Sequence, residues 1–290
     1  MNHNPLTLNP HSGNVRRGIA RSLARRAARV ACAVVVLAAT LAASAHADEI
    51  QVMVSGGFAA PYRTLVAEWE KSTGHKVTSV YGASMGTTPT AIPNRLAGGE
   101  HADIVIVARE ALDRLVTEGK IIETSPLDLV RSRIGMAVKA GIAKPDISTE
   151  ARFRQVLLDA ASIAYSDSAS GVYISTEMFQ KLGIADQVRT KARMIPGTPV
   201  GEILAAGEAE VGFQQISELL PIQGITFVGP IPDSVQRVTT FSAGLTPSSR
   251  VLGAARQLLA YLSSSQAWAT VRRAGLDPAG APAAAGAGAR

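Results

Sequence analysis

A strand–loop–helix pattern repeats along the chain and constrains the fold more than any other sequence feature. The β-prone runs Glu49–Val54, Lys76–Tyr81 and Asp103–Val107 predict strands. Each leads through a short loop into a segment with apolar residues at helical spacing. Strands that alternate with helices run parallel, because each helix returns the chain to the same end of the sheet. The pattern therefore predicts an α/β fold with a parallel sheet covered by helices on both faces.

A second series of the same kind lies between two longer predicted strands, Arg133–Lys139 and Val235–Leu245. Its expected strands and helices are Ser162–Tyr165, Val172–Leu182, Val200–Ala206 and Glu210–Gln214. This layout predicts two α/β lobes joined by two crossing strands. Lobe 1 is expected to hold residues 48–132 and 236–277, and lobe 2 residues 133–235.

The end of the chain has two amphipathic helical segments, Arg250–Tyr261 and Gln266–Arg273, which are expected to pack back on lobe 1. Residues 278–290 are composed almost entirely of Ala, Gly and Pro. This composition predicts a disordered tail.

The first 47 residues have the features of a secretory signal peptide. An Arg-rich segment precedes the apolar run Val30–Ala43, and Ala45-His46-Ala47 is a small-x-small cleavage site. The apolar run is shorter than the roughly 20 residues that span a bilayer. The sequence therefore predicts export to the periplasm and cleavage after Ala47.

The leader also accounts for the formal charge of +6. It carries six arginines and no acidic residue, so 23 basic and 23 acidic residues remain in the mature chain. A neutral body without basic runs argues against nucleic-acid binding, which depends on many Lys or Arg contacts to phosphates. The single cysteine, Cys32, leaves with the leader, which excludes disulfides and thiolate metal sites. No metal or cofactor is expected, since Gly-rich phosphate loops are absent as well.

One motif points to an enzyme. Gly82-Ala83-Ser84-Met85-Gly86 matches G-x-S-x-G between a predicted strand and a helix, which is the setting of a serine nucleophile. The mature chain has only His75 and His101, however, and neither follows the second lobe. A serine hydrolase that uses Ser84 is therefore the alternative hypothesis rather than the leading one.

Loops rich in Gly, Ser and Thr follow several predicted strands and precede helices. Backbone N–H groups and hydroxyls in such loops bind anions without bringing a charge of their own. In open α/β sheets, ligands also bind at this carboxyl edge of the strands. The loops are Ser55-Gly56-Gly57, Ser84–Thr88, Ser166–Gly171 and Gly197-Thr198-Pro199.

The chain resembles the exported solute-binding proteins of ABC importers, in particular the molybdate-binding-like branch of the two-lobed type II periplasmic binding protein fold. The resemblance covers about residues 50–278 and rests on the order and spacing of six segments. These are Gln51–Phe58, Trp69–Val77, Tyr81–Gly86, Ala102–Ile106, Leu115–Gly119 and Gly207–Phe213. It implies a protein that performs no covalent chemistry, captures a small anion between its lobes and delivers it to a membrane permease.

The resemblance also implies which residues bind the anion. In lobe 1 they are Ser55, Gly57 and Ser84, and in lobe 2 Ser170, Pro199 or Val200, and Gln215. Two positions depart from the family: Gly57 replaces a serine, and Gln214-Gln215 replaces a tyrosine.

Two further residues have open roles. Arg109 either faces the cleft, where it can pair with a carboxylate, or pairs with Glu110 or Asp113 on the surface. Tyr173 either turns its hydroxyl to the cleft, which we favour, or anchors its helix against the sheet.

The expected ligand is a tetrahedral oxyanion such as molybdate or a small organic carboxylate, and the Gln pair and Arg109 favour the carboxylate. The protein is expected to act as a monomer. The candidate ligand-binding residues are Ser55, Gly56, Gly57, Phe58, Ser84, Met85, Arg109, Ser168, Ser170, Gly171, Tyr173, Pro199, Gln214 and Gln215.

Overall fold

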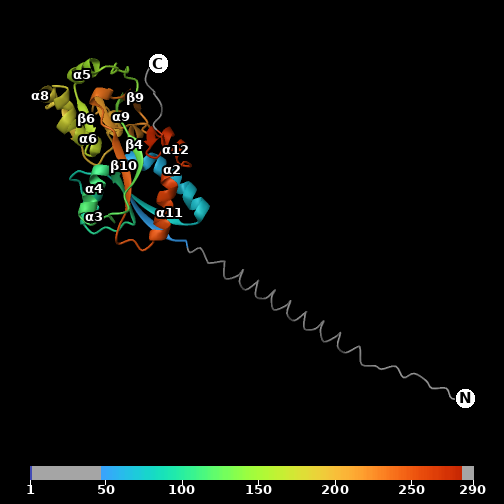
Figure 1. Ribbon diagram of the computed structural model, residues 1–290. Coiled ribbons are helices and arrows are strands. Elements are labelled where there is room, and N and C mark those ends of the chain that lie inside the picture. The colour runs from blue at the N-terminus through green and yellow to red at the C-terminus, as the bar shows by residue number, and fades with distance from the viewer. Residues whose placement is uncertain (2–46, 283–290) are drawn as a thin grey trace. The chain divides into compact units, whose positions relative to one another are not determined.

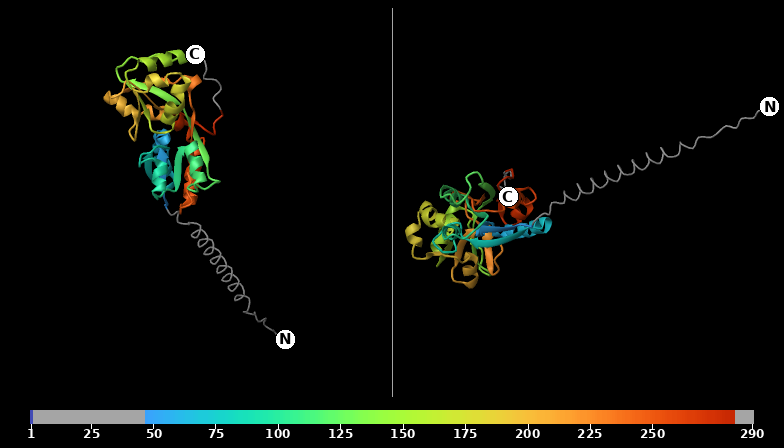
Figure 2. Two further views of the ribbon diagram at one scale, coloured as in Figure 1. Left: turned by 90° about the vertical axis from the view of Figure 1, so that its left-hand side faces the viewer. Right: turned by 90° about the horizontal axis from the view of Figure 1, so that it is seen from below.

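The computed structural model describes Met1 and residues 47–282 (Figure 1). The predicted signal peptide, apart from Met1 and Ala47, lies outside the described residues, as do residues 283–290 of the predicted tail. Residues 47–282 hold two lobes, each built on its own sheet (Figure 2). Among the described residues, no helix has the length and apolar character needed to span a bilayer.

The sheet of lobe 1 has six strands in the order β11-β4-β10-β3-β1-β2. Strand β1 runs parallel to β2 and β3, whereas β10 is antiparallel to both β3 and β4, and β11 is antiparallel to β4. The sheet is therefore mixed. The expected parallel arrangement is correct only for β1, β2 and β3. The strands are β1 (Glu49–Ser55), β2 (Lys76–Gly82), β3 (Ile104–Ala108), β4 (Leu127–Ser132), β10 (Thr239–Leu245) and β11 (Leu276–Pro278).

Helices cover both faces of this sheet, and the strand sequences explain why. Residues Ile104 to Ala108 of β3 are all buried, and they alternate between two hydrophobic clusters. One cluster packs against α2, α11 and α12, and the other against α3 and α4. The helices are α2 (Gly56–Thr73), α3 (Ile92–Ala97), α4 (Arg109–Thr117), α11 (Leu252–Ser263) and α12 (Trp268–Arg273).

The sheet of lobe 2 has five strands in the order β7-β6-β8-β5-β9. Strand β6 is parallel to β7 and β8, and β5 is antiparallel to β8 and β9. The strands are β5 (Ile134–Lys139), β6 (Ile163–Ser166), β7 (Ala192–Ile195), β8 (Val211–Gln215) and β9 (Ile225–Pro230). The helices are α5 (Glu150–Asp159), α6 (Ala169–Tyr173), the π-helix η2 (Ile174–Met178), α7 (Phe179–Lys181), α8 (Ala185–Val188), α9 (Val200–Ala206), α10 (Ile216–Leu219) and the 3-10 helix η3 (Asp233–Val235).

The chain crosses between the sheets twice. The first crossing joins β4 to β5 between Ser132 and Ile134, and the second joins β9 to β10 through η3. The Gln236 side chain ties the crossings together, because its Oε1 accepts from the Ile134 backbone N–H at 2.8 Å and its Nε2 donates to the Ile134 carbonyl at 3.0 Å. The expected single strand Val235–Leu245 is wrong at its start, since β10 begins at Thr239.

The chain stays ordered beyond the expected start of the tail. Pro278 ends strand β11, where it pairs with Val130, and the Ala279 backbone N–H donates to the Leu129 carbonyl at 2.9 Å. The tail prediction therefore begins too early.

Candidate functional site: a serine-lined cavity between the lobes

A cavity of about 330 Å³ lies between the lobes at the ends of β1, β2, β6 and β8. We call it the serine-lined cavity. From lobe 1 it is lined by Ser55, Gly56, Ala59, Arg63, Tyr81, Gly82, Ala83, Thr88 and Thr90, and from lobe 2 by Ser166, Asp167, Ser168, Gly197, Thr198, Pro199, Gln214 and Glu218. Three of the expected loops therefore contribute directly, and the fourth contributes through Thr88. Ligand sites for small molecules start at about this size.

Ser84 organises the lobe 1 side of this cavity from beneath. It is fully buried, its Oγ donates to Ser55 Oγ at 2.7 Å, and the same Oγ accepts from the Ala108 backbone N–H at 2.9 Å. Both hydrogen bonds of the Ser84 hydroxyl are therefore made inside the protein. Ser55 lines the cavity and accepts a hydrogen bond from Ser84. The expected role of Ser84 as a direct ligand donor is not what the geometry favours; it positions Ser55.

The Ser84 position also bears on the serine hydrolase hypothesis. His75 Nδ1 accepts from the Asp48 backbone N–H at 3.0 Å, and its ring stacks on Trp69. His101 lies 3.5 Å from Asp103. Among the residues that the structure describes, Ser84 therefore has no histidine base within hydrogen-bond distance.

The Ser84→Ala variant is expected to lower the free energy of unfolding by about 1–3 kcal/mol, because it leaves the buried Ala108 N–H without an acceptor. Urea unfolding measures this change. The exposed Thr117→Ala variant, which removes a helix-surface hydroxyl, is the control and should stay within about 0.5 kcal/mol of the parent chain. Equal effects of the two substitutions would contradict the role given to Ser84.

The loops of the two lobes touch across the cavity. The Ser84 backbone N–H donates to Ser168 Oγ at 3.2 Å. Gly86 lies beside this contact with a φ of 111°, and a Cβ there would come within 2.8 Å of the Asp167 carbonyl oxygen. Only glycine permits both this backbone conformation and this approach.

Two expected residues of the lobe 2 loop lie behind the cavity rather than in it. Ser170 is buried, with its Oγ 3.1 Å from Ser166 Oγ. Gly171 packs so closely on β6 that a Cβ would lie 1.5 Å from the Ser166 carbonyl oxygen. Ser170 and Gly171 therefore support Ser166 and Ser168, which do line the cavity.

The first loop differs from the expectation in a similar way. Helix α2 begins at Gly56, directly after β1, so Ser55-Gly56-Gly57 is not a loop. Gly57 therefore turns away from the cavity, and a Cβ there would overlap the Phe241 ring at 2.1 Å. Phe58 belongs to the hydrophobic core of lobe 1, and its assignment to the ligand site is wrong. The Gly57 carbonyl accepts from Ser217 Oγ at 2.7 Å, which is a second direct contact between the lobes.

The glutamine pair divides between two roles. Gln214 lines the serine-lined cavity, where its Oε1 accepts from the Val200 backbone N–H at 2.9 Å and its Nε2 donates to Glu218 Oε1 at 3.0 Å. Gln215 lies behind the wall and donates to Thr239 Oγ1 at 3.1 Å. Pro199 also lines the cavity, immediately before α9.

Glu218 is the acidic residue of the cavity whose pKa is shifted. The pKa of its carboxyl group is raised to about 7, mainly by burial and in smaller part by the nearby Asp167. Hydrogen bonds from the Gln214 side chain and the Gln215 backbone act in the opposite direction and lower this pKa.

A second cavity, of about 290 Å³, holds three of the other expected residues. Met85, Arg109 and Tyr173 all line it, together with Glu110, Glu177 and Arg237. They therefore do not share a cavity with Ser55 and Ser168, and a single ligand site that includes all of them is wrong.

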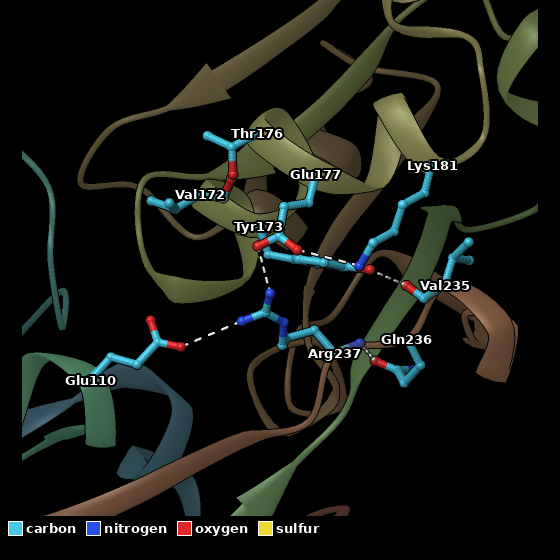
Figure 3. Close-up of polar contacts among 9 residues, drawn as sticks. All are labelled: Glu110, Val172, Tyr173, Thr176, Glu177, Lys181, Val235, Gln236 and Arg237. Carbon is cyan, nitrogen blue, oxygen red and sulfur yellow. Dashed lines mark hydrogen bonds and ion pairs between the residues drawn. The ribbon is translucent and has the colours of Figure 1, made fainter.

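Polar contacts in the second cavity occupy the groups that were expected to bind a ligand (Figure 3). The Tyr173 hydroxyl donates to the Val235 carbonyl at 2.8 Å, so Tyr173 anchors its helix. Arg237 lies over the Tyr173 ring at 4.7 Å, pairs with Glu177 and donates to Glu110 Oε1 at 3.4 Å. Glu110 belongs to lobe 1 and Glu177 to lobe 2, so Arg237 bridges the lobes.

Arg109 is engaged in the same manner. Its Nε donates to Asp113 at 2.7 Å and its Nη1 to Asp128 at 3.0 Å, and these two carboxylates raise the pKa of the guanidinium group. Pairing with Asp113 was the surface alternative, and it is confirmed.

Residues from helices complete the serine-lined cavity, and sequence reasoning missed them. Arg63 lies two turns into α2 and stacks over Tyr81 at 4.4 Å, and Glu218 lies in α10. One signal was available for Glu218, because it lies four residues after Gln214. Finding it requires knowing that β8 continues into α10 without a loop.

Two lobes that meet at a polar cavity and are joined by two strand crossings have the architecture of a two-lobed binding protein. The comparison with known families gives the same result: the chain belongs to the bacterial extracellular solute-binding protein family, which matches residues 50–277.

Two relatives stand out among similar sequences. An aconitate isomerase of a Pseudomonas species is 46% identical over 229 residues, which cover 79% of this chain and 87% of the relative. The molybdate-binding protein ModA of Azotobacter vinelandii is 25% identical over 182 residues, which cover 61% of this chain and 68% of the relative.

Solved structures confirm the fold. The periplasmic molybdate-binding protein of Azotobacter vinelandii aligns with a TM-score of 0.64 at 20% identity, covering 78% of this chain and 98% of that chain. The sulfate-binding protein of Mycobacterium tuberculosis aligns with a TM-score of 0.62 at 19% identity, covering 80% and 88%. The chain therefore has the fold of the molybdate-binding-like periplasmic proteins, as the sequence predicted.

Proposed function

We propose that this protein is exported to the periplasm and binds a small organic carboxylate, of the aconitate class, in the serine-lined cavity. One observation carries the proposal: hydroxyl and amide groups from both lobes converge on one cavity. Ligand-driven closure of two lobes needs such a divided set of donors, because the ligand then favours the closed arrangement by its differential affinity. Delivery of a monomeric protein to the permease of an ABC importer is part of the proposal, and it rests on the family.

The charges of the cavity support a carboxylate over a tetrahedral oxyanion. Arg63 is the one basic residue among those that line it, and Asp167 and Glu218 oppose a fully ionised ligand. A polycarboxylate spreads its charge over separate groups, so one group can meet Arg63 while another meets Ser55 and the amino-terminal turn of α2. The relative named aconitate isomerase favours the same class of ligand.

A thermal-shift panel on the mature protein tests the proposal. Cis- and trans-aconitate and related di- and tricarboxylates are expected to raise the melting temperature, since a ligand at 100 times its Kd stabilises by about 2.7 kcal/mol. Molybdate, tungstate, sulfate and phosphate serve as the comparison set. The Ser55→Ala variant should reduce the shift, and the Thr117→Ala control should keep it. Shifts with molybdate alone, or with no anion at all, would contradict a carboxylate site.

Isomerisation of the bound carboxylate is a second candidate function. The specific observation that favours it is an acid group, Glu218, in the wall of a cavity proposed to bind anions. Conversion of cis- into trans-aconitate by the purified protein, followed by nuclear magnetic resonance, tests it directly.

A further inference from the structure

The serine-lined cavity contains a carboxyl group that anion binding alone does not require. A carboxylate repels an anionic ligand, yet Glu218 lies in the cavity wall beside Ser55 and Gly56. It is the last residue but one of α10, which continues directly from β8 and so brings Gln214 and Glu218 to the same wall.

The surroundings of this carboxyl group hold it in one place. Gln214 Nε2 donates to its Oε1 at 3.0 Å, and a Cβ at Gly56 would lie 2.2 Å from the same oxygen. The carboxyl group of lobe 2 therefore fills the space that glycine leaves at the start of α2 in lobe 1. Ser217, the preceding residue, fixes this arrangement through its bond to the Gly57 carbonyl.

The other carboxyl group of the cavity is placed differently. Asp167 Oδ2 accepts from the Gly197 backbone N–H at 3.1 Å, which ties this side chain to the loop that precedes α9. Neither a lysine nor an arginine pairs with Glu218 among the described residues. Within that part of the chain, Glu218 therefore has no cationic partner that would hold it ionised, and burial raises the pKa of its carboxyl group.

We infer that Glu218 is a catalytic residue that moves a proton between two carbons of a bound unsaturated carboxylate. This inference rests on the proposed function, because it requires the ligand to occupy the serine-lined cavity. The carboxylate form of Glu218 removes a proton from a methylene group that lies between a carboxylate and a carbon–carbon double bond. The C–H electron pair spreads over three carbons and the attached carboxylates, and the protonated Glu218 then returns the proton to the far carbon.

This step needs no oxidant, metal or cofactor. One C–H bond breaks and another forms, the double bond moves by one position, and Glu218 ends as it began. Hydroxyls such as that of Ser55 are placed to stabilise the negative charge that develops on the ligand carboxylates. A carboxyl group whose pKa burial has raised to about 7 both accepts and returns a proton near neutral pH.

Proton exchange measured in D2O tests the inference separately from binding. Parent protein, Glu218→Gln and the exposed control Glu123→Gln are each incubated with cis-aconitate in D2O, and deuterium incorporation is followed by nuclear magnetic resonance. Calorimetric titration of the same samples gives the Kd. We expect the parent and Glu123→Gln to incorporate deuterium, and Glu218→Gln to bind aconitate but exchange about 100-fold more slowly or not at all.

The outcomes separate the inference from the proposed function. Binding by the parent with neither deuterium incorporation nor conversion of cis- into trans-aconitate overturns the inference and leaves the binding function in place. A Glu218→Gln variant whose rate of deuterium exchange is within about threefold of the parent's also overturns the inference. In that case, an Asp167→Asn variant that does not exchange would assign the proton transfer to Asp167. Failure of the parent to bind any carboxylate overturns both.

Discussion

At pH 8 the Glu218→Gln variant is expected to be more stable than the parent chain by about 3 kcal/mol, the equivalent of a pKa raised from 4.5 to about 7. In the unfolded chain the carboxyl group ionises near its usual pKa, whereas in the folded protein burial keeps the proton bound up to about pH 7. The folded state therefore binds more protons than the unfolded state between these pH values, and stability falls as the pH rises through this range. A glutamine side chain does not ionise and avoids this loss.

The sign of the effect makes the measurement specific. Urea unfolding of the parent and of Glu218→Gln should differ most above pH 7, and the difference should shrink as the pH falls towards 4.5. Glu123→Gln, in which an exposed carboxyl is replaced, is the matched control and should show no such trend. A difference of the same size at every pH would mean that the amide stabilises by packing or hydrogen bonding rather than by removing a buried charge.

The Gly171→Ala variant is expected to lose about 3 kcal/mol or more of stability, at the upper end of overpacking effects. The new Cβ would lie 1.5 Å from the Ser166 carbonyl oxygen, and a backbone carbonyl has no rotamer into which it can move. Either α6 or the end of β6 must shift. Because Ser166 and Ser168 line the serine-lined cavity, carboxylate binding should weaken together with stability.

Gly253→Ala is the control for this substitution. Gly253 lies in α11 with open space where its Cβ would be, so alanine should stabilise the helix by about 0.5–1 kcal/mol. Opposite signs for the two glycine variants in urea unfolding are the expected result. Similar unfolding midpoints for the two variants would contradict this prediction. They would show that the backbone around Ser166 shifts to accommodate the added methyl group at little cost in stability.

Part of the order of strands and helices could be predicted, because several buried strands are recognisable on their own. In β3 every residue from Ile104 to Ala108 faces one of two hydrophobic layers, so the run is apolar throughout. Strand β4 was missed because Asp128 and Arg131 interrupt its apolar pattern. Both are polar for reasons that lie outside the strand: Asp128 pairs with Arg109 of α4, and Arg131 donates to the chain beyond β11.

The candidate site was predictable where a ligand-binding residue is of a type that also forms turns at strand ends. Ser55 and Ser168 were found because serines at strand ends are visible in the sequence. Gly57 and Phe58 were misassigned because Ser-Gly-Gly also occurs where a helix starts directly after a strand, and the Phe241 side chain that requires Gly57 lies 184 positions away.

Charged residues were the least predictable part of the site. Arg109 and Glu218 are both charged residues near the start of a helix. Only the fold shows that Asp113 and Asp128 neutralise Arg109, whereas Glu218 lies in the wall of the cavity.

The direct contacts between the lobes affect what a membrane partner can recognise. The pairs are Ser84 with Ser168, Ser217 with Gly57, and Arg237 with Glu177, and each joins two groups of the protein itself. Part of the free energy of closure is therefore independent of loading. A membrane partner that recognises only the closed arrangement would also bind protein that carries no ligand. Stronger contacts between the lobes would make such unproductive binding more frequent.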